Sequence, residues 1–194
     1  MKGLLSAALG VFLVAVFWGG PVTARAQEQS TEIQGFYQTY RDFSFETGFS
    51  DIDIPATSLN GGGFTSAQNL APWFALWTQL SFYGSAETTN HRVRIINNLQ
   101  GLRWQTRRYG PLQLYAKGGA GFSHYSMDIA GSGYGEYKLS VAYGGGAFLW
   151  ANEHFGLVLD ATHTTSGMPN LTDADDRDKW DSGLTLATGL AIRF

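Results

Sequence analysis

The chain has 194 residues, a formal net charge of −3 and no cysteine. The length fits a single domain, and the lack of cysteine excludes disulfides, thiol chemistry and cysteine metal sites. The acidic balance argues against nucleic acid as a partner. The 25 glycines and the many aromatic residues favour short strands joined by turns.

Residues 1–26 have the three parts of a secretory signal peptide. Lys2 supplies a positive charge, residues 4–18 form an apolar run, and the ARA sequence at 24–26 is a small-residue cleavage site. The alternative is a membrane anchor helix, but the run is shorter than the roughly 20 residues that span a bilayer. The sequence therefore predicts cleavage after residue 26 and export across an inner membrane.

Residues 27–42 are interpreted as an N-terminal lead-in to a barrel formed by residues 43–194. The aromatic residues Phe36, Tyr37 and Tyr40 are either interfacial anchors or part of an ordinary amphipathic segment. Alternation of apolar with small or polar residues predicts eight strands in the barrel. Their predicted ranges are 43–54, 60–69, 73–86, 92–106, 112–128, 136–151, 155–165 and 179–194.

The last of these segments, 179–194, alternates most clearly. One face carries large apolar residues, including Leu190, Ile192 and Phe194, and the other carries small or polar residues, including Gly183 and Thr185. A soluble lipocalin-like periplasmic barrel would bury the apolar face, whereas a barrel in lipid turns it outward. Faces of Ala, Gly, Ser and Thr with few charges would cover a soluble exterior poorly, so the lipid case is favoured.

The connections between the predicted strands alternate in character. Roomier or more polar connections follow the first, third, fifth and seventh strands, and tight turns follow the others. Outer-membrane barrels have this pattern, with short periplasmic turns and longer external loops. The predicted fold is an all-β, eight-stranded, antiparallel up-and-down transmembrane β-barrel. Within it, the glycines at 61–63 indicate a bend or a close backbone approach.

Several segments carry a family resemblance. They are LNGGGFTSAQNLAPWFALWTQLSFYGS, NLQGLRWQTR, YAKGGAGFSHYS, AYGGGAFLW and the terminal Phe194. Together they resemble the OmpA/OmpX-like outer-membrane β-barrel domain family. The resemblance implies an outer-membrane location, contact with outer-membrane lipid and lipopolysaccharide, and recognition of the C-terminal strand by the barrel assembly machinery. It brings no catalytic residue, and we expect a monomer.

Six charged residues are predicted to face the lumen. An eight-stranded barrel is just wide enough for side chains to fill it, so these charges must pair or hydrogen-bond. The favoured interpretation is a packed polar core without a continuous pore, and the alternative is an ion path. The six residues are Glu46, Arg103, Lys117, Lys138, Asp160 and Arg193.

One stretch, HTTSGMPN at 163–170, is faintly similar to part of the lipid A 3-O-deacylase family. That family uses a serine nucleophile two residues after its histidine, which places both on one strand face. Here Ser166 follows His163 by three residues, and Thr165 takes the same-face position. We therefore predict no catalytic residue, with a lipid A-modifying hydrolase as the alternative function.

No metal or cofactor is predicted. The four histidines, His91, His124, His154 and His163, lack metal-ligand spacing. The acidic loop at 173–178 hints at a divalent cation, but it lacks the central glycine and terminal glutamate of a calcium loop, so a solvated loop is the simpler interpretation. The predicted function is a structural or adhesive role through extracellular loops.

Overall fold

The computed structural model describes residues 30–46, 53–84, 91–129, 132–167 and 180–194. The expected signal peptide at 1–26 and the acidic loop at 173–178 lie outside these residues. The side chain of Glu46 is also outside the description. Within the described residues, no helix is long and apolar enough to cross a membrane.

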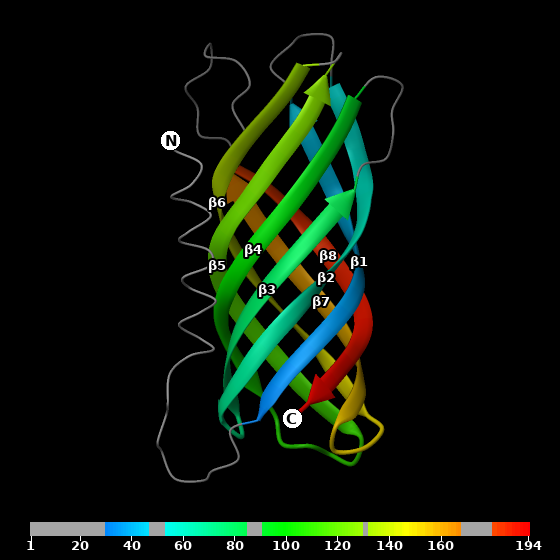
Figure 1. The fold of residues 1–194 in the computed structure, drawn as a ribbon, viewed down its shortest axis with the longest axis vertical. Helices are drawn as coiled ribbons and strands as arrows, with labels where there is room; N and C mark the ends of the chain where they lie inside the picture. The colour runs from blue at the N-terminus through cyan, green and yellow to red at the C-terminus, as the bar shows by residue number, and fades with distance from the viewer. Residues whose placement is uncertain (1–29, 47–52, 85–90, 130–131, 168–179) are drawn as a thin grey trace.

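Eight strands close into one antiparallel barrel, in which each strand pairs with its neighbours in sequence and β8 pairs with β1 (Figure 1). This confirms the predicted fold class. The strands are β1 (Thr31–Glu46), β2 (Asp53–Ala71), β3 (Phe74–Gly84), β4 (His91–Gln105), β5 (Leu112–Ile129), β6 (Ser132–Trp150), β7 (Phe155–Gly167) and β8 (Trp180–Arg193).

The predicted first strand, 43–54, is wrong. β1 begins at Thr31, so residues 31–42 of the expected lead-in form most of this strand. The predicted strand instead covers the end of β1 and the start of β2, which begins at Asp53. The apolar alternation of β1 is weak because its outward positions include Gly35 and Thr39, whereas three phenylalanines alternate just beyond them.

Of the other seven predicted strands, 60–69 lies within the longer β2, and the remaining six agree with the structure to within a few residues. Short connections follow β2, β4 and β6, as predicted, and they lie at the end of the barrel where β1 begins and β8 ends (Figure 1). In an outer-membrane barrel this is the periplasmic end. We call it the lower end, as it is drawn in Figure 1, and the opposite end the upper end.

Side chains alternate between the lumen and the outer wall. In β3, Ala75, Trp77 and Tyr83 are buried inside, while Leu76 and Phe82 point outward. The predicted facing of β3, β5 and β8 is confirmed throughout their described side chains. Large apolar residues of the outer wall are about half exposed, with Leu157 at 52% and Leu190 at 63%. A soluble lipocalin-like barrel would bury these residues, so the structure contradicts that alternative.

The glycines at 61–63 lie where backbones approach closely, as predicted. A Cβ atom on Gly61 would overlap the carbonyl oxygen of Phe82, and one on Gly63 would overlap that of Leu80. Only glycine leaves this space free, because it has no Cβ. The neighbouring strand β3 therefore packs closely against β2 at this point.

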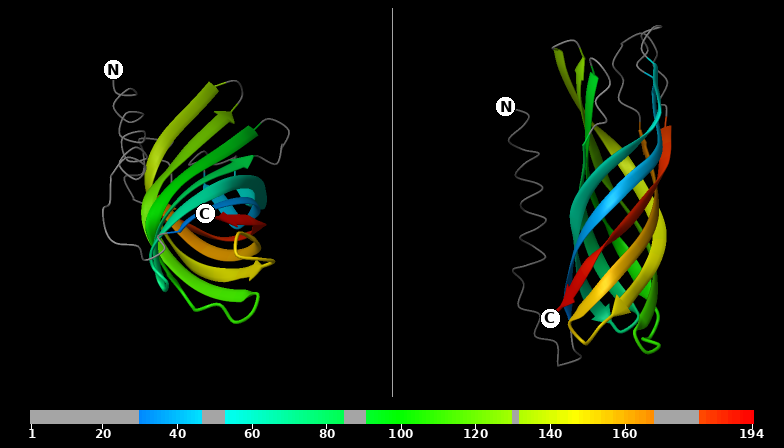
Figure 2. Two further views of the ribbon diagram at one scale, coloured as in Figure 1. Left: turned by 60° about the horizontal axis from the view of Figure 1, so that its bottom comes forward. Right: turned by 90° about the vertical axis from the view of Figure 1, so that its right-hand side faces the viewer.

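At the upper end of the barrel, the described strand pairings extend to different heights. β5 and β6 pair continuously from Leu112 with Leu149 to Ile129 with Ser132. The described pairing between β6 and β7 stops at Ser140 with Ser166. Residues 132–139 of β6 therefore continue beyond its last described pair with β7, and the ribbons of β5 and β6 reach the top of the barrel as drawn in Figure 1 and in the right-hand view of Figure 2.

Candidate functional site in the lumen

A buried group of charges occupies the lower end of the lumen. Arg103 Nη1 lies 2.8 Å from Glu32 Oε1, and Arg193 Nη2 lies 3.1 Å from Glu32 Oε2. Glu32 is fully buried and Arg103 is 1% exposed. The register of β1 and β8 places Glu32 opposite Arg193, and Arg103 reaches both from β4. We call these three residues the lower charge cluster.

Amide side chains complete the hydrogen bonding around the lower charge cluster. Gln34 Nε2 donates to Glu32 Oε1 at 2.7 Å. Asn69 Oδ1 accepts from Arg103 at 3.4 Å and from Gln105 Nε2 at 2.9 Å. Gln113 Oε1 accepts from Arg193 Nη2 at 3.0 Å. Such partners are required, because a charge taken out of water without compensation costs several kcal/mol.

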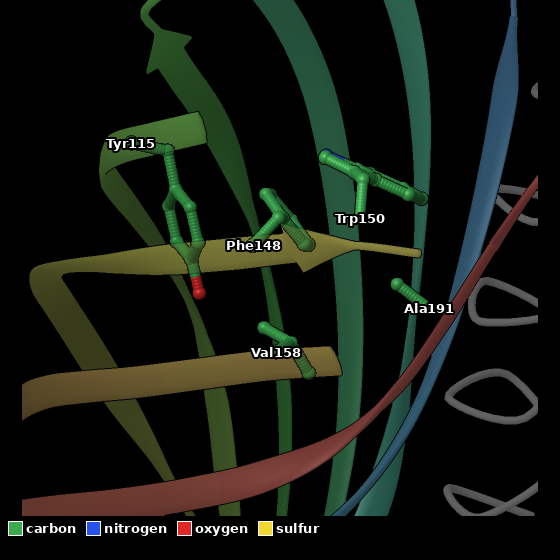
Figure 3. Packing of buried hydrophobic residues seen from close by; sticks show 5 residues of the cluster. All are labelled: Tyr115, Phe148, Trp150, Val158 and Ala191. Carbon is green, nitrogen blue, oxygen red and sulfur yellow. The ribbon is translucent and has the colours of Figure 1, made fainter. Parts of the chain in front are cut away.

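Aromatic rings pack over the same charges. Figure 3 shows side chains of Tyr115, Phe148, Trp150, Val158 and Ala191, which come from four consecutive strands and point into the lumen. The Arg193 guanidinium lies 4.1 Å from the centre of the Trp150 ring, and that of Arg103 lies 5.2 Å from the Phe148 ring. The aromatic faces therefore add cation–π attraction and exclude water from the ion pairs.

A second ion pair lies in the middle of the lumen. Lys117 Nζ is 3.0 Å from Asp160 Oδ2, and it also donates to Gln79 Oε1 at 3.1 Å. Asp160 accepts further hydrogen bonds from Tyr115 and Thr162, each at 2.5 Å. The cavity beside this pair has a volume of only about 10 Å³. That is room for about one water molecule, so side chains fill the lumen here.

The upper lumen is held by hydroxyl groups. Ser123 Oγ lies 2.5 Å from Ser140 Oγ, and the Tyr125 hydroxyl contacts Ser166 Oγ. We call these four residues the upper hydroxyl cluster. All four are buried. Neutral hydrogen bonds between these side chains fill the space between β5, β6 and β7. At the lower end, ion pairs fill the corresponding space.

The lumen contains four of the six charged residues predicted to face it, namely Arg103, Lys117, Asp160 and Arg193. Lys138 shares their inward alternation but lies above the last β6–β7 pair, where it contacts Glu136 at 2.8 Å with 22% of its side chain exposed.

Sequence reasoning missed Glu32, the central carboxylate, because it fell in the expected lead-in. The alternation of Glu32, Gln34 and Gln38 with Ile33 and Tyr37 is the signal that could have revealed it.

The residues of the possible deacylase motif do not meet. Ser166 is buried in the lumen, where its hydroxyl contacts that of Tyr125. His163 faces the outer wall, with its ring 5.1 Å from that of Tyr143. The two residues therefore lie on opposite faces of β7, as their spacing predicts, and Thr165 lies on the same face as His163.

The histidines whose side chains are described are far from forming a metal site. His124 stacks on Tyr137 at 4.3 Å between ring centres, and His154 Nδ1 contacts the carbonyl oxygen of Arg193 at 3.0 Å. Among the described residues, no group of three or more histidine, aspartate or glutamate side chains is placed to hold a metal ion.

An apolar outer wall, a closed eight-stranded ladder and a lumen filled by polar side chains together define a small outer-membrane β-barrel. Every backbone group of such a ladder can be paired inside the lipid. The family resemblance found in the sequence is thus confirmed at the level of the fold.

Solved structures with this fold come from several bacteria. The crystal structure of Neisserial surface protein A has 10% sequence identity and a TM-score of 0.68, covering 86% of this chain and 100% of that one. The attachment invasion locus protein Ail of Yersinia pestis has 18% identity and a TM-score of 0.54, covering 87% and 100%. OprG of Pseudomonas aeruginosa has 14% identity and a TM-score of 0.57, covering 86% and 96%.

These identities are low, so the likeness shows a common fold alone. No protein-family model matches the chain. No curated protein sequence matches it either.

Proposed function

We propose that this chain is a non-conducting, non-catalytic outer-membrane scaffold that presents an interaction surface beyond its upper rim. The observation that carries this proposal is the extension of β5 and β6 past the end of the β6–β7 ladder. In an outer-membrane barrel the end opposite the short turns faces the cell exterior. The extension therefore lies where a partner outside the cell can reach it.

The surface of the extension has the composition of an interface. Tyr137 is 64% exposed and stacks on His124, and Leu139 beside it is 52% exposed. Exposed tyrosine and aliphatic side chains are typical of interaction surfaces. These two side chains lie on β6 beyond its last described pair with β7, Ser140 with Ser166.

The solved structure of Ail supports the same role by analogy. That protein is described as an attachment invasion locus protein, and a second structure holds it in complex with the heparin analogue sucrose octasulfate. The fold that this chain shares with Ail supports, by analogy, an attachment role.

The test is adhesion by cells of a Gram-negative host that display the barrel. We expect these cells to adhere to polystyrene and to cultured epithelial cells more than vector-only cells do. The variant Tyr137→Ser/Leu139→Ser should lose most of this gain. The matched control is Tyr109→Ser, which removes an exposed tyrosine at the opposite end. Equal adhesion by all strains at equal surface levels would refute the proposal.

The filled lumen supports the non-conducting part of the proposal. Ion pairs and aromatic rings occupy the interior of the barrel. They are the ion pairs of Glu32 and Asp160 and the buried rings of Trp77, Tyr83 and Tyr115. Purified protein in planar bilayers should therefore show no stable, large single-channel conductance. Steady porin-like steps would contradict a sealed lumen.

The separation of His163 from Ser166 supports the non-catalytic part. With the histidine on the lipid side and the serine in the lumen, His163 does not reach the Ser166 hydroxyl to act as its base. The refolded protein should release no fatty acid from lipid A by mass spectrometry. Release that disappears in both His163→Ala and Ser166→Ala would show a hydrolase instead.

The outward face of β8 supports the proposed lipid contact and assembly. Leu190 and Phe194 are 63% and 69% exposed and would lie against outer-membrane lipid or lipopolysaccharide. If the assembly machinery reads this strand, deleting Phe194 should lower outer-membrane yield far more than urea resistance in detergent. Trp180→Ala, on the same face, serves as the control. Equal damage in both assays would count against recognition.

The closed ladder needs no second copy, which supports a monomer.

A further inference from the structure

The lower end of the lumen opens into a cavity with a volume of about 740 Å³. We call this cavity the lower vestibule. One part of its lining is apolar, and the rest is polar and rich in arginine. The lining includes Leu70, Pro72, Gln105, Arg107, Arg108 and Arg193.

Positive charge is in excess around the lower vestibule. Arg103 and Arg193 share a single carboxylate, that of Glu32, so the buried cluster has one guanidinium more than it has carboxylates. Among the described residues that line the mouth are two arginines, Arg107 and Arg108, and one carboxylate, that of Glu153. A buried charge without a counter-charge is costly, so this end of the lumen attracts an anion.

Two polar atoms beside the lower vestibule have no hydrogen-bond partner in the protein. Gln105 is 8% exposed, and its Nε2 donates to Asn69 Oδ1 and Pro72 O, which leaves Oε1 without a donor. The Nε atom of Arg193 also has no acceptor. The lining of the vestibule therefore includes an acceptor without a partner, Gln105 Oε1, and a cationic donor without a partner, Arg193 Nε.

We propose that the lower vestibule binds the carboxylate end of a short peptide. The ligand carboxylate contacts the guanidinium groups, whose planar forks match its two oxygens. The adjacent N–H of the peptide donates to Gln105 Oε1, and a small apolar side chain packs on Leu70 and Pro72. The cavity volume lies within the range of small-molecule sites.

The free acceptor separates this ligand from a simple inorganic anion. A sulfate ion would satisfy the arginines, but it has no donor for Gln105 Oε1, and Glu153 adds a further negative charge at the mouth. A peptide carboxylate carries one negative charge and has its own donor one residue away. It therefore satisfies the arginines and the glutamine together.

The experiment is isothermal titration of the refolded full chain in detergent with N-acetyl-dialanine. Binding is expected, and the C-terminal amide of the same peptide should bind about tenfold more weakly or worse, since hydrogen bonds to charged groups are worth about 1.5–3 kcal/mol. Inorganic sulfate, which has no donor, should also bind more weakly. The matched peptides differ only in the carboxylate, so the comparison isolates its contribution.

Two variants locate the site. Arg107→Gln/Arg108→Gln should weaken N-acetyl-dialanine about tenfold while leaving the lower charge cluster intact. Gln105→Leu should weaken the peptide but not sulfate. The control is Arg94→Gln, an exposed arginine near the start of β4 at the upper end. Heat-modifiable gel migration checks that each variant is folded.

Three results would overturn the proposal. The first is no binding of N-acetyl-dialanine at millimolar concentration, and the second is equal binding of the peptide and its amide. The third is sulfate binding as tight as that of the peptide and insensitive to Gln105→Leu, which would show non-selective anion attraction. If Gln105→Leu does not fold, the double arginine variant and the comparison with the peptide amide still test the proposal.

Discussion

The two ends of the lumen are filled in different ways. The lower charge cluster holds one fully buried carboxylate between two arginines, whereas the upper hydroxyl cluster joins neutral groups in pairs. Both solutions satisfy polar side chains inside a closed barrel. They differ in what remains when one member is lost, because an orphaned charge costs far more than an orphaned hydroxyl. The lower end should therefore be much less tolerant of substitution.

The surroundings of the two clusters strengthen this contrast. At the lower end, Phe148 and Trp150 pack against the guanidinium groups and keep water from the ion pairs. Water that could compensate a lost partner is therefore scarce around Glu32 and Arg103, which are buried, whereas Arg193 borders the lower vestibule. At the upper end a hydroxyl can rotate toward another acceptor, since its hydrogen is free to turn.

The largest effect is expected from Glu32→Gln. The change removes the carboxylate shared by Arg103 and Arg193 and leaves two buried guanidiniums without a counter-charge. Breaking a buried pair in this way should lower the free energy of unfolding by about 3–5 kcal/mol. Urea unfolding of the refolded protein in detergent measures the change.

The control for this prediction is Glu136→Gln. Glu136 pairs with Lys138 above the rim, and its side chain is 37% exposed. An exposed pair contributes no more than about 1 kcal/mol. If the two glutamate variants lose the same stability, burial does not determine the cost of losing a charge in this barrel.

A smaller effect is expected at the pair in the middle of the lumen. Lys117→Met leaves Asp160 with its hydrogen bonds from Tyr115 and Thr162, so the carboxylate keeps two partners. Asp160→Asn leaves Lys117 bonded to Gln79. A double-mutant cycle should give a coupling free energy of about 1–3 kcal/mol. Additive effects of the two substitutions would mean that the pair contributes nothing beyond its separate contacts.

The sequence predicted the inward charges more readily than their partners. Arg103, Lys117 and Asp160 lie at inward positions of strands whose alternation is visible, so their facing follows from the period of two. The contacts among them depend on strand tilt and on register across the lumen. For example, Arg103 on β4 meets Glu32 on β1, 71 residues away. Alternation along one strand carries no information about such a pairing.

The two regions whose structure was predicted least well from the sequence, β1 and the lower vestibule, are both at the lower end. β1 was missed because its lumen side is made of Glu32, Gln34 and Gln38, and its outer side includes Gly35, so no apolar face stands out. The lower vestibule depends on where the turn residues 105–108 lie relative to 69–72. Composition identifies those segments as turns but cannot place them beside one another.

The smallest loss of stability is expected in the upper hydroxyl cluster. It tests whether a lost neutral partner costs less than a lost charged one. Ser123→Ala leaves the fully buried Ser140 hydroxyl without the contact at 2.5 Å. A buried neutral group that loses its partner costs about 1–3 kcal/mol, below the cost expected for Glu32→Gln.

Replacing both serines removes the orphan as well as the bond, which can be nearly neutral. Ser123→Ala/Ser140→Ala should therefore be at least as stable as Ser123→Ala alone in the same urea assay. The corresponding double change at the lower end, Glu32→Gln/Arg103→Gln, still leaves Arg193 without a carboxylate and should recover little. A serine double variant less stable than the sum of its single variants would show that the hydroxyls act as an extended network. The contrast between the two ends would then be one of degree, because both would lose cooperative polar contacts.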